Sequence, residues 1–320
     1  MIIRGDGAVH VFAVAMRTRF RGIDVREGVL VHGPGGWAEF SPFWDYDTAE
    51  CVPWLRAARE AAFDIWPKPR RERIPVNCIV PAVPPARARE IVMAGHGCRT
   101  AKVKVAEPGQ TERDDLARVE AVRDALGPGG RIRIDANGAW DLDTAVVMIG
   151  RLDQEAGGLE YAEQPCATVE ELAKVRRKVG VPIAADESIR RAEDPFRVAR
   201  MEAADIAVLK VQPLGGVRAS LRIAEQIALP VVVSSALETS VGLAAGVALA
   251  AALPDLPYAC GLATLQVLED DVAADPLVPA DGMLPVVRPE PDPGRLADLA
   301  ADQSTRARWM ERLARVEDAA

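Results

Sequence analysis

The sequence predicts an α/β fold, a (β/α)8 barrel of the TIM type with an N-terminal α+β capping domain that the C-terminal segment completes. Short, continuously apolar runs alternate with helical segments along the middle of the chain, as in parallel strands buried on both faces. Five of these runs end in a charged residue, at intervals of 31, 28, 23 and 24 residues, and each interval fits one strand, one helix and two loops. The five charged residues are Lys104, Asp135, Glu163, Asp186 and Lys210.

The chain divides into three expected parts. Residues 1–72 alternate apolar and polar positions, which predicts antiparallel strands, and a helix is expected over 48–62. Residues 73–264 carry the alternation of strands and helices and are assigned to the barrel. Residues 265–320 are rich in proline and acidic residues, and we expect them to return to the capping domain and end in a helix near 303–318.

Each barrel element has a local signal. Four residues, Gly127 to Gly130, end the helix that starts at 114, and Thr168 with Glu171 forms a capping box. The expected strands cover 75–80, 100–105, 131–135, 159–163, 181–186, 205–210, 230–234 and 257–261. The expected helices cover 114–126, 141–152, 168–178, 194–202, 216–228 and 240–252.

Composition restricts the class of protein. The chain has 320 residues and a net charge of −8, with no basic tract, so nucleic-acid binding is not expected. Five scattered cysteines without a CxxC pair suggest buried thiols in a reducing compartment. The N-terminus lacks the pattern of a signal peptide, and the longest apolar run, 241–253, is too short to cross a bilayer. We therefore expect a cytoplasmic protein that does not contact membranes.

Three acids follow consecutive predicted strands. Asp135, Glu163 and Asp186 would meet at the C-terminal mouth of the barrel, where the catalytic residues of such barrels lie. One acid after a strand is more often a helix cap, but three on consecutive strands favour a metal site. Oxygen ligands suit Mg²⁺ or Mn²⁺, and all three histidines precede Asp135, so a histidine-bound metal is not expected.

Basic residues flank these acids. Lys102 and Lys104 are two apart on one strand, so both should point the same way. If they face inward, each lowers the pKa of the other by like-charge repulsion, which favours a general base. The alternative is that both face outward with their amines in solvent. Arg133 precedes Asp135 by two residues and should point inward, towards Lys102 or the substrate.

Other positions are weaker candidates for contacts with a substrate. Asn137, before Gly138, is either part of a turn or an amide beside the cation. The helix start at Gly215 and Gly216, and the hydroxyls of Ser234 and Ser235, could each donate to an anion.

Six motifs together resemble the enolase superfamily. They are Lys-Val-Lys, Asp-Ala-Asn-Gly-Ala-Trp, Glu-Gln-Pro, Asp-Glu-Ser, Val-Leu-Lys and Ser-Ser-Ala-Leu-Glu-Thr-Ser-Val-Gly-Leu, in that order along the chain. The lysines resemble the muconate-lactonising subgroup of that superfamily. Segments 234–243, 261–265 and 16–22 look most like a branch that dehydrates a hydroxycyclohexadiene carboxylate to an aromatic acid in menaquinone biosynthesis. Ala263 stands where that branch usually has an aspartate.

The resemblance implies roles for the residues. Mg²⁺ would lie on Asp135, Glu163 and Asp186 and bind a small carboxylate substrate, with Lys104 as the base and Lys210 on the opposite face. The supporting residues that we expect near the substrate are Lys102, Arg133, Asn137, Ser234, Ser235, Gly261, Arg19 and Arg21. The two last belong to a basic cap loop that would close the mouth and cover a dianion.

Several alternatives stay open at this point. The same residues serve N-acylamino acid racemases and dipeptide epimerases, so the sequence does not separate dehydration from racemisation. A Schiff-base aldolase could use the lysine on the sixth strand, and a barrel could also bind an acidic ligand or partner without catalysis. The oligomeric state is not predicted.

Overall fold

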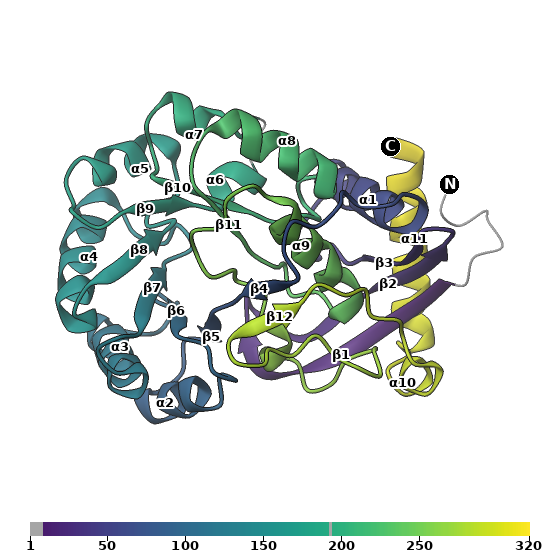
Figure 1. Cartoon of the computed structure of the whole chain (residues 1–320), viewed down its shortest axis with the longest axis horizontal. Coiled ribbons are helices and arrows are strands. Elements are labelled where there is room, and N and C mark those ends of the chain that lie inside the picture. Colours follow the sequence, from purple (N-terminus) through teal and green to yellow (C-terminus); the bar gives the residue numbers. More distant parts are fainter. Residues whose placement is uncertain (1–8, 192–193) are drawn as a thin grey trace.

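A parallel sheet curls into the barrel on one side of the molecule (Figure 1). A computed structural model describes residues 9–191 and 194–320. The strand order is β11-β10-β9-β8-β7-β6-β5, so strands that follow one another in sequence are also neighbours in space. The strands are β5 Cys78–Val80, β6 Thr100–Lys104, β7 Arg131–Asp135, β8 Leu159–Glu163, β9 Ile183–Ala185, β10 Ile206–Leu209 and β11 Val231–Val233.

Short parallel bridges close the barrel. Gly261 pairs with Ser234 just beyond β11, and Cys260 pairs with Val76 just before β5. The predicted eighth strand over 257–261 is therefore wrong as a continuous strand, although its end occupies the eighth place in the ring. Pro257, which has no N–H to donate, begins the predicted segment and weakens its pairing.

Helices cover the outside of the barrel (Figure 1). Capping boxes at Thr111 and Thr168 start α3 and α5, and Asp141 caps α4. The predicted helix over 194–202 is only α7, because Glu202 turns into the left-handed conformation (φ 50°). The helices are α2 Pro85–Met93, α3 Glu112–Leu126, α4 Leu142–Ala156, α5 Val169–Arg176, α6 Glu187–Arg190, α7 Arg197–Arg200, α8 Val217–Ile227 and α9 Ser240–Ala252.

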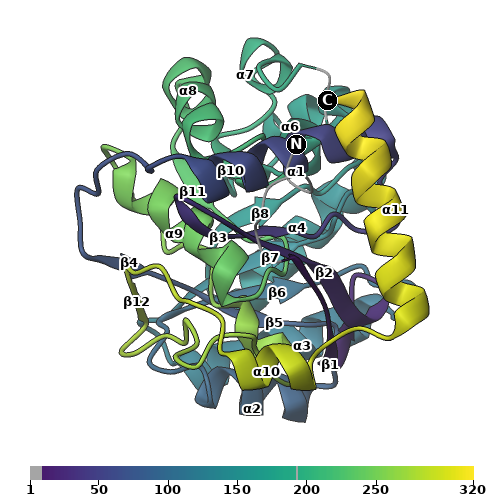
Figure 2. The ribbon, with the colours of Figure 1, turned by 90° about the vertical axis from the view of Figure 1, so that its right-hand side faces the viewer.

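The capping domain is a three-stranded antiparallel sheet in the order β1-β2-β3, as the alternating pattern predicted. Its inner positions are apolar and buried, and they pack with the helices α1 and α11 (Figure 2). Asp47 and Glu50 form a capping box at the start of α1. The elements are β1 Val9–Phe20, β2 Ile23–Gly33, β3 Gly36–Phe40, α1 Thr48–Phe63 and α11 Gln303–Ala319.

The C-terminal segment returns to the cap as expected. Leu268 forms a bridge to Met16, and Ala300 forms one to Phe12, so the return runs beside β1. Strand β12 (Met283–Pro285) pairs antiparallel with β4 (Arg73–Pro75), and the 3₁₀ helix η1 (Thr264–Val267) and α10 (Pro293–Asp298) complete the segment.

The core runs from the barrel into the cap without a break. Helix α9 is apolar on nearly every side and twelve of its thirteen residues are buried, because it packs against both β11 and β3. All five cysteines are buried and free. Within the described residues, no helix is both long enough and apolar enough to cross a membrane.

Candidate active site

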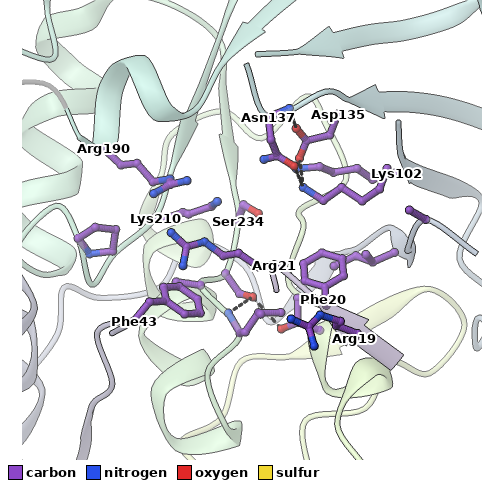
Figure 3. A pocket seen from close by; sticks show the side chains of 18 of the residues that line it. Arg19, Phe20, Arg21, Phe43, Lys102, Asp135, Asn137, Arg190, Lys210 and Ser234 are labelled. Carbon is purple, nitrogen blue, oxygen red and sulfur yellow. Dashed lines mark hydrogen bonds and ion pairs between the residues drawn. The ribbon is translucent and has the colours of Figure 1, made fainter. Parts of the chain in front are cut away.

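A cavity of about 310 Å³ lies where the barrel mouth meets the capping domain. The barrel contributes the charged side chains and the cap contributes aromatic ones, which Figure 3 shows facing one another. The lining includes Lys102, Lys104, Asp135, Asn137, Arg190, Lys210, Ser234, Ser235, Ala236 and Leu237 from the barrel, and Arg19, Phe20, Arg21, Phe43, Tyr46 and Trp54 from the cap.

Three buried carboxylates stand at the ends of consecutive strands. Asp135 ends β7, Glu163 ends β8 and Asp186 follows β9, and each is at most 1% exposed. Cα register pairs Asp135 with Glu163 across β7 and β8, which places both side chains at one level of the barrel. The structure thus brings together the three acids that the spacing singled out.

Two lysines bind these acids from β6. The ammonium of Lys102 lies 2.9 Å from Asp135 Oδ2 and also donates to Glu163 Oε1. The ammonium of Lys104 lies 2.6 Å from Asp135 Oδ2 and donates to the side-chain oxygen of Asn137. Both lysines therefore point inward, and the outward alternative is wrong.

Lys210 approaches from the other side of the ring. It follows β10, and its ammonium donates to Asp186 Oδ2 at 2.7 Å. In a ring of eight positions closed by residues 260–261, β6 and β10 are four places apart and face each other. A flat substrate between them would have one lysine on each face.

The acids and lysines change one another's pKa values. Burial opposes the charge of Lys102, but Asp135 and Glu163 outweigh burial and raise the pKa of Lys102 well above its usual range. The prediction that the pKa of Lys102 is lowered is thus wrong. Two carboxylates lie within ion-pair distance of its ammonium, and the spacing of residues in the sequence did not reveal this. Burial lowers the pKa of Lys210 despite Asp186. Burial also opposes ionisation of Asp135, but Lys102 and Lys104 hold the pKa of Asp135 well below its usual range.

Glu163 differs from the other two acids. Burial, together with the negative charges of Asp135 and Asp186, raises the pKa of Glu163 to about 7, although Lys102 opposes the shift. Its Oε2 is buried and has no hydrogen-bond donor among the described residues. A buried carboxylate oxygen without a donor, close to two further carboxylates, fits a hard divalent cation. As they stand, no three acidic, histidine or cysteine side chains of the described chain are arranged to hold a metal ion, and Lys102 lies between Asp135 and Glu163.

Arg133 lies below the pocket. It is fully buried and points inward as predicted, but it does not line the cavity. Its Nε donates to Glu160 at 2.5 Å and its Nη1 donates to Asn77 Oδ1 at 3.0 Å, while its guanidinium packs 4.7 Å from the ring of Tyr161. The expected contact with Lys102 or substrate is wrong: Arg133 is the register partner of Lys102, but its guanidinium binds Glu160 and Asn77 while Lys102 binds Asp135 and Glu163.

The segment over 16–22, expected as a loop, is the end of β1 and the turn that follows it. Its residues 18–21 line the cavity, but acidic residues of the cap bind both of its arginines. Arg19 donates to Asp24 at 2.6 Å, and this pair is exposed. Arg21 donates to both oxygens of Asp45, at 3.0 and 3.1 Å, and its guanidinium stacks 3.9 Å from the ring of Phe43. Arg21 therefore fastens this segment at the mouth, and its cover of a bound dianion stays a prediction.

The weaker candidates are placed as follows. Asn137 is a turn residue, with φ 48°, and its amide contacts Lys104 and Glu187 in the site; an amide beside a cation stays a prediction. Ser234 and Ser235 line the cavity, and the hydroxyl of Ser235 donates to Thr264 at 2.7 Å. Gly261 lets the chain approach Ser234, since a Cβ there would lie 2.7 Å from the serine Oγ.

The helix start at Gly216 holds an anion from the protein itself. The carboxylate of Glu60, from α1, accepts from the backbone N–H groups of Val217 and Arg218. This position is therefore closed to a substrate, which is a correction to the expected donor role of the two glycines.

Arg190 and Tyr46 are site residues that the sequence reading did not find. Arg190 donates from Nε to Asp186 Oδ1 at 2.9 Å and also contacts Glu187 and the hydroxyl of Tyr46. Its position four residues after Asp186 on a helix was the available signal, since side chains four apart on a helix are neighbours. No local signal marks Tyr46, because only the packing of the cap against the barrel brings it to the site.

Comparison with known proteins identifies the family. Residues 11–62 match the family described as enolase N-terminal domain-like, and residues 85–302, more than half of the chain, match the one described as enolase C-terminal domain-like. The chain therefore belongs to the enolase superfamily. Among curated relatives, a protein of Thermobifida fusca named o-succinylbenzoate synthase is 66% identical over 95% of this chain and 94% of its own length.

Further relatives carry the same name. The o-succinylbenzoate synthases of Mycolicibacterium smegmatis and Mycobacterium tuberculosis are 55% and 54% identical over 95% of this chain, and over 94% and 92% of their own lengths. Among solved structures, the muconate lactonizing enzyme of Pseudomonas fluorescens has a TM-score of 0.77 at 21% identity, covering 92% of this chain and 98% of that one. The L-Ala-D/L-Glu epimerase of Bacillus subtilis has a TM-score of 0.75 at 21% identity, covering 89% and 96%. These two likenesses describe the fold alone.

Proposed function

We propose that this chain is an o-succinylbenzoate synthase, a lyase that removes water from 2-succinyl-6-hydroxy-2,4-cyclohexadiene-1-carboxylate to form 2-succinylbenzoate in menaquinone biosynthesis. One observation carries the chemistry: lysines of the facing strands β6 and β10 pair with three buried carboxylates, and Lys104, Lys210 and Asp135 line one cavity. The 66% identity to a relative of that name supports the choice of substrate.

We propose that Asp135, Glu163 and Asp186 would hold Mg²⁺, or Mn²⁺ in its place. The unpartnered Oε2 of Glu163 and the oxygen-only donor set support this assignment. When bound, the cation would act as a Lewis acid towards the substrate carboxylate and so acidify the neighbouring C–H bond. Lys102, which lies between two of these acids, would then keep their combined negative charge balanced.

The side chains themselves would carry out the proton transfers. Lys104 removes the proton from the carbon that bears the carboxylate, and electron density moves into the carboxylate. The same ammonium then gives its proton to the leaving hydroxyl on that face, so one residue serves both steps of a syn elimination. Lys210, on the opposite face, stabilises the developing negative charge or the ring through its positive charge.

The cap would exclude water during these steps. Phe20 lies 5.3 Å from the ammonium of Lys104, and Arg21 holds the loop against Asp45 and Phe43. An aromatic side chain over the base limits the access of solvent to the reacting carbon. The partner of the site is a small carboxylate substrate. The net charge of the chain, −8, gives no support to nucleic acid as a partner. We also propose that the enzyme works in the cytoplasm.

A racemase or epimerase is the second candidate. Lysines on both faces of one pocket are what proton removal from one face and return to the other requires. The Schiff-base aldolase is less well supported, because the ammonium of Lys210 is paired with Asp186 and three acids would have no role.

One assay separates these functions. Purified protein is incubated with Mg²⁺ and the cyclohexadiene substrate while aromatic absorbance is followed, and in parallel with an N-succinylamino acid whose optical rotation is followed. We expect aromatic product from the wild type and none from Lys104→Ala. Racemisation without dehydration would favour the second candidate, and activity that persists in Lys104→Ala would contradict the assignment of the base.

A further inference from the structure

One wall of the pocket is a short segment that follows β11. This wall segment, residues 234–239, presents Ser234, Ser235, Ala236 and Leu237 to the cavity and leads directly into α9. Leu237 has φ 64°, a left-handed conformation that costs free energy for a residue other than glycine. Such a conformation persists only where surrounding contacts determine it.

Arg26 of β2 supplies the first of these contacts from the capping domain. Only 2% of this residue is exposed, and its Nε donates to the carbonyl of Leu237 at 2.9 Å. Its Nη2 donates to the carbonyl of Ala236 at 3.2 Å and to the hydroxyl of Ser41 at 2.8 Å. One rigid guanidinium thus fixes two successive carbonyls of the wall segment to the cap. The same group stacks 4.4 Å from the ring of Phe43, which also lines the cavity.

Glu39 of β3 supplies the second contact. Its Oε2 accepts from the backbone N–H of Thr239 at 3.0 Å, from the Thr239 hydroxyl at 2.6 Å and from the N–H of Gly242 at 3.2 Å. Helix α9 has no capping hydrogen bond from its own N-cap side chain, so this carboxylate serves as its cap from another domain. A Cβ at position 242 would lie 2.8 Å from Glu39 Oε2, which explains the glycine of the motif.

We propose that Arg26 and Glu39 are positioning residues that hold the wall segment against the substrate. Neither residue lines the cavity, so neither would touch the substrate itself. Their contacts end on the backbone of residues 236, 237, 239 and 242, and only the capping domain carries them. The capping domain thereby sets the shape of a barrel wall as well as covering the mouth. The kinetic consequence of this proposal rests on the proposed function.

The chain offers a matched control at the other end of the same helix. The guanidinium of Arg71 donates to the carbonyls of Ala250, Leu253 and Pro254, far along the chain from the wall segment. Arg71 does not line the cavity. Arg26→Met removes hydrogen bonds to the wall segment before α9, and Arg71→Met removes a similar set at the C-terminal end of α9. Only Arg26→Met should affect the pocket.

The test compares amide hydrogen exchange and steady-state kinetics in the full-length wild type, Arg26→Met, Arg26→Lys and Arg71→Met. In Arg26→Met we expect peptides that cover residues 234–243 to exchange roughly tenfold faster, because lost buried hydrogen bonds permit local opening. In Arg71→Met the acceleration should be confined to residues 247–254. KM should rise roughly tenfold in Arg26→Met with a smaller change in kcat, because ground-state contacts are lost while the base stays in place.

The conservative variant keeps the proposal testable if methionine prevents folding. Lysine keeps the charge beside Glu39 but cannot bind two carbonyls as a planar fork, so Arg26→Lys should show the same pattern at smaller size. Unchanged exchange over 234–243 in both Arg26 variants, or an equal rise in KM in Arg71→Met, would overturn the proposal. A wild type that does not dehydrate the substrate would contradict the proposed function, and the exchange experiment would still decide the role of Arg26.

Discussion

The buried carboxylate of Glu39 should make stability depend on pH in a way that one substitution can isolate. Burial raises the pKa of Glu39 from 4.5 to about 7, against the opposing charge of Arg26 and the hydrogen bonds from Ser41 and Thr239. The negative charge of Glu238 adds to the rise in the pKa of Glu39. Asp271 accepts from the N–H of Ser240, the first residue of α9. Glu39→Gln removes the titration and keeps the size of the side chain.

The sign and the size follow from linkage. The folded protein holds the proton of Glu39 more tightly than the unfolded chain does, so the contribution is fully present below pH 4.5 and is lost as pH rises towards 7. A shift from 4.5 to about 7 corresponds to roughly 3 kcal/mol in total, since one pH unit is worth about 1.4 kcal/mol. Between pH 5 and pH 8 the loss amounts to about 2 to 3 kcal/mol, because part of it has already occurred at pH 5.

Urea unfolding at pH 5 and pH 8, for the wild type and Glu39→Gln, measures this quantity. Glu39→Gln weakens the hydrogen bonds that Glu39 accepts from Thr239 and Gly242 at both pH values. This cost cancels when the difference in stability between variant and wild type at pH 5 is subtracted from that at pH 8. We expect the free energy of unfolding of the variant, relative to wild type, to improve by about 2 to 3 kcal/mol from pH 5 to pH 8. A relative stability that stays constant within about 0.5 kcal/mol would refute the reasoning and would mean that Glu39 is ionised at no cost.

Three further outcomes are expected. EDTA should abolish activity, and Mg²⁺ or Mn²⁺ should restore it. Asp186→Asn should weaken metal binding, measured by calorimetry, together with activity. Full activity in metal-free protein would contradict the metal site. Lys210→Arg should keep measurable dehydration and solvent-deuterium exchange while any racemisation disappears, and exchange lost as completely as in Lys104→Ala would reverse the assignment of the two faces. Arg21→Ala should raise KM several-fold and change the free energy of unfolding by less than about 1 kcal/mol, because its partner Asp45 is exposed; an unchanged KM with a lower melting temperature would make Arg21 structural.

The sequence by itself determined the alternation of strands and helices in the barrel and the charged residues at its mouth. The strands predicted over 131–135 and 159–163 agree with the structure to the residue, and the one predicted over 100–105 ends one residue earlier, because buried parallel strands are continuous apolar runs. The capping box at Thr168 was predicted, since it depends on residues three apart; the one at Thr111 is equally local but was not predicted, and its helix was expected to begin only at 114. Helix α2 gave no such signal, because prolines at its start replace a polar cap and its N-cap residue makes no side-chain hydrogen bond.

Only the tertiary structure decided which charges meet. Arg133 and Lys102 are register partners on neighbouring strands and both point inward, yet Arg133 binds Glu160 below the pocket and Lys102 binds the acids of the site. The partners of Glu39 and Glu60 are set by how the capping domain docks on the barrel, over separations of 200 and 157 residues. Side-chain periodicity fixes which way a residue points, whereas the partner of a charge depends on distances between elements that no local pattern contains.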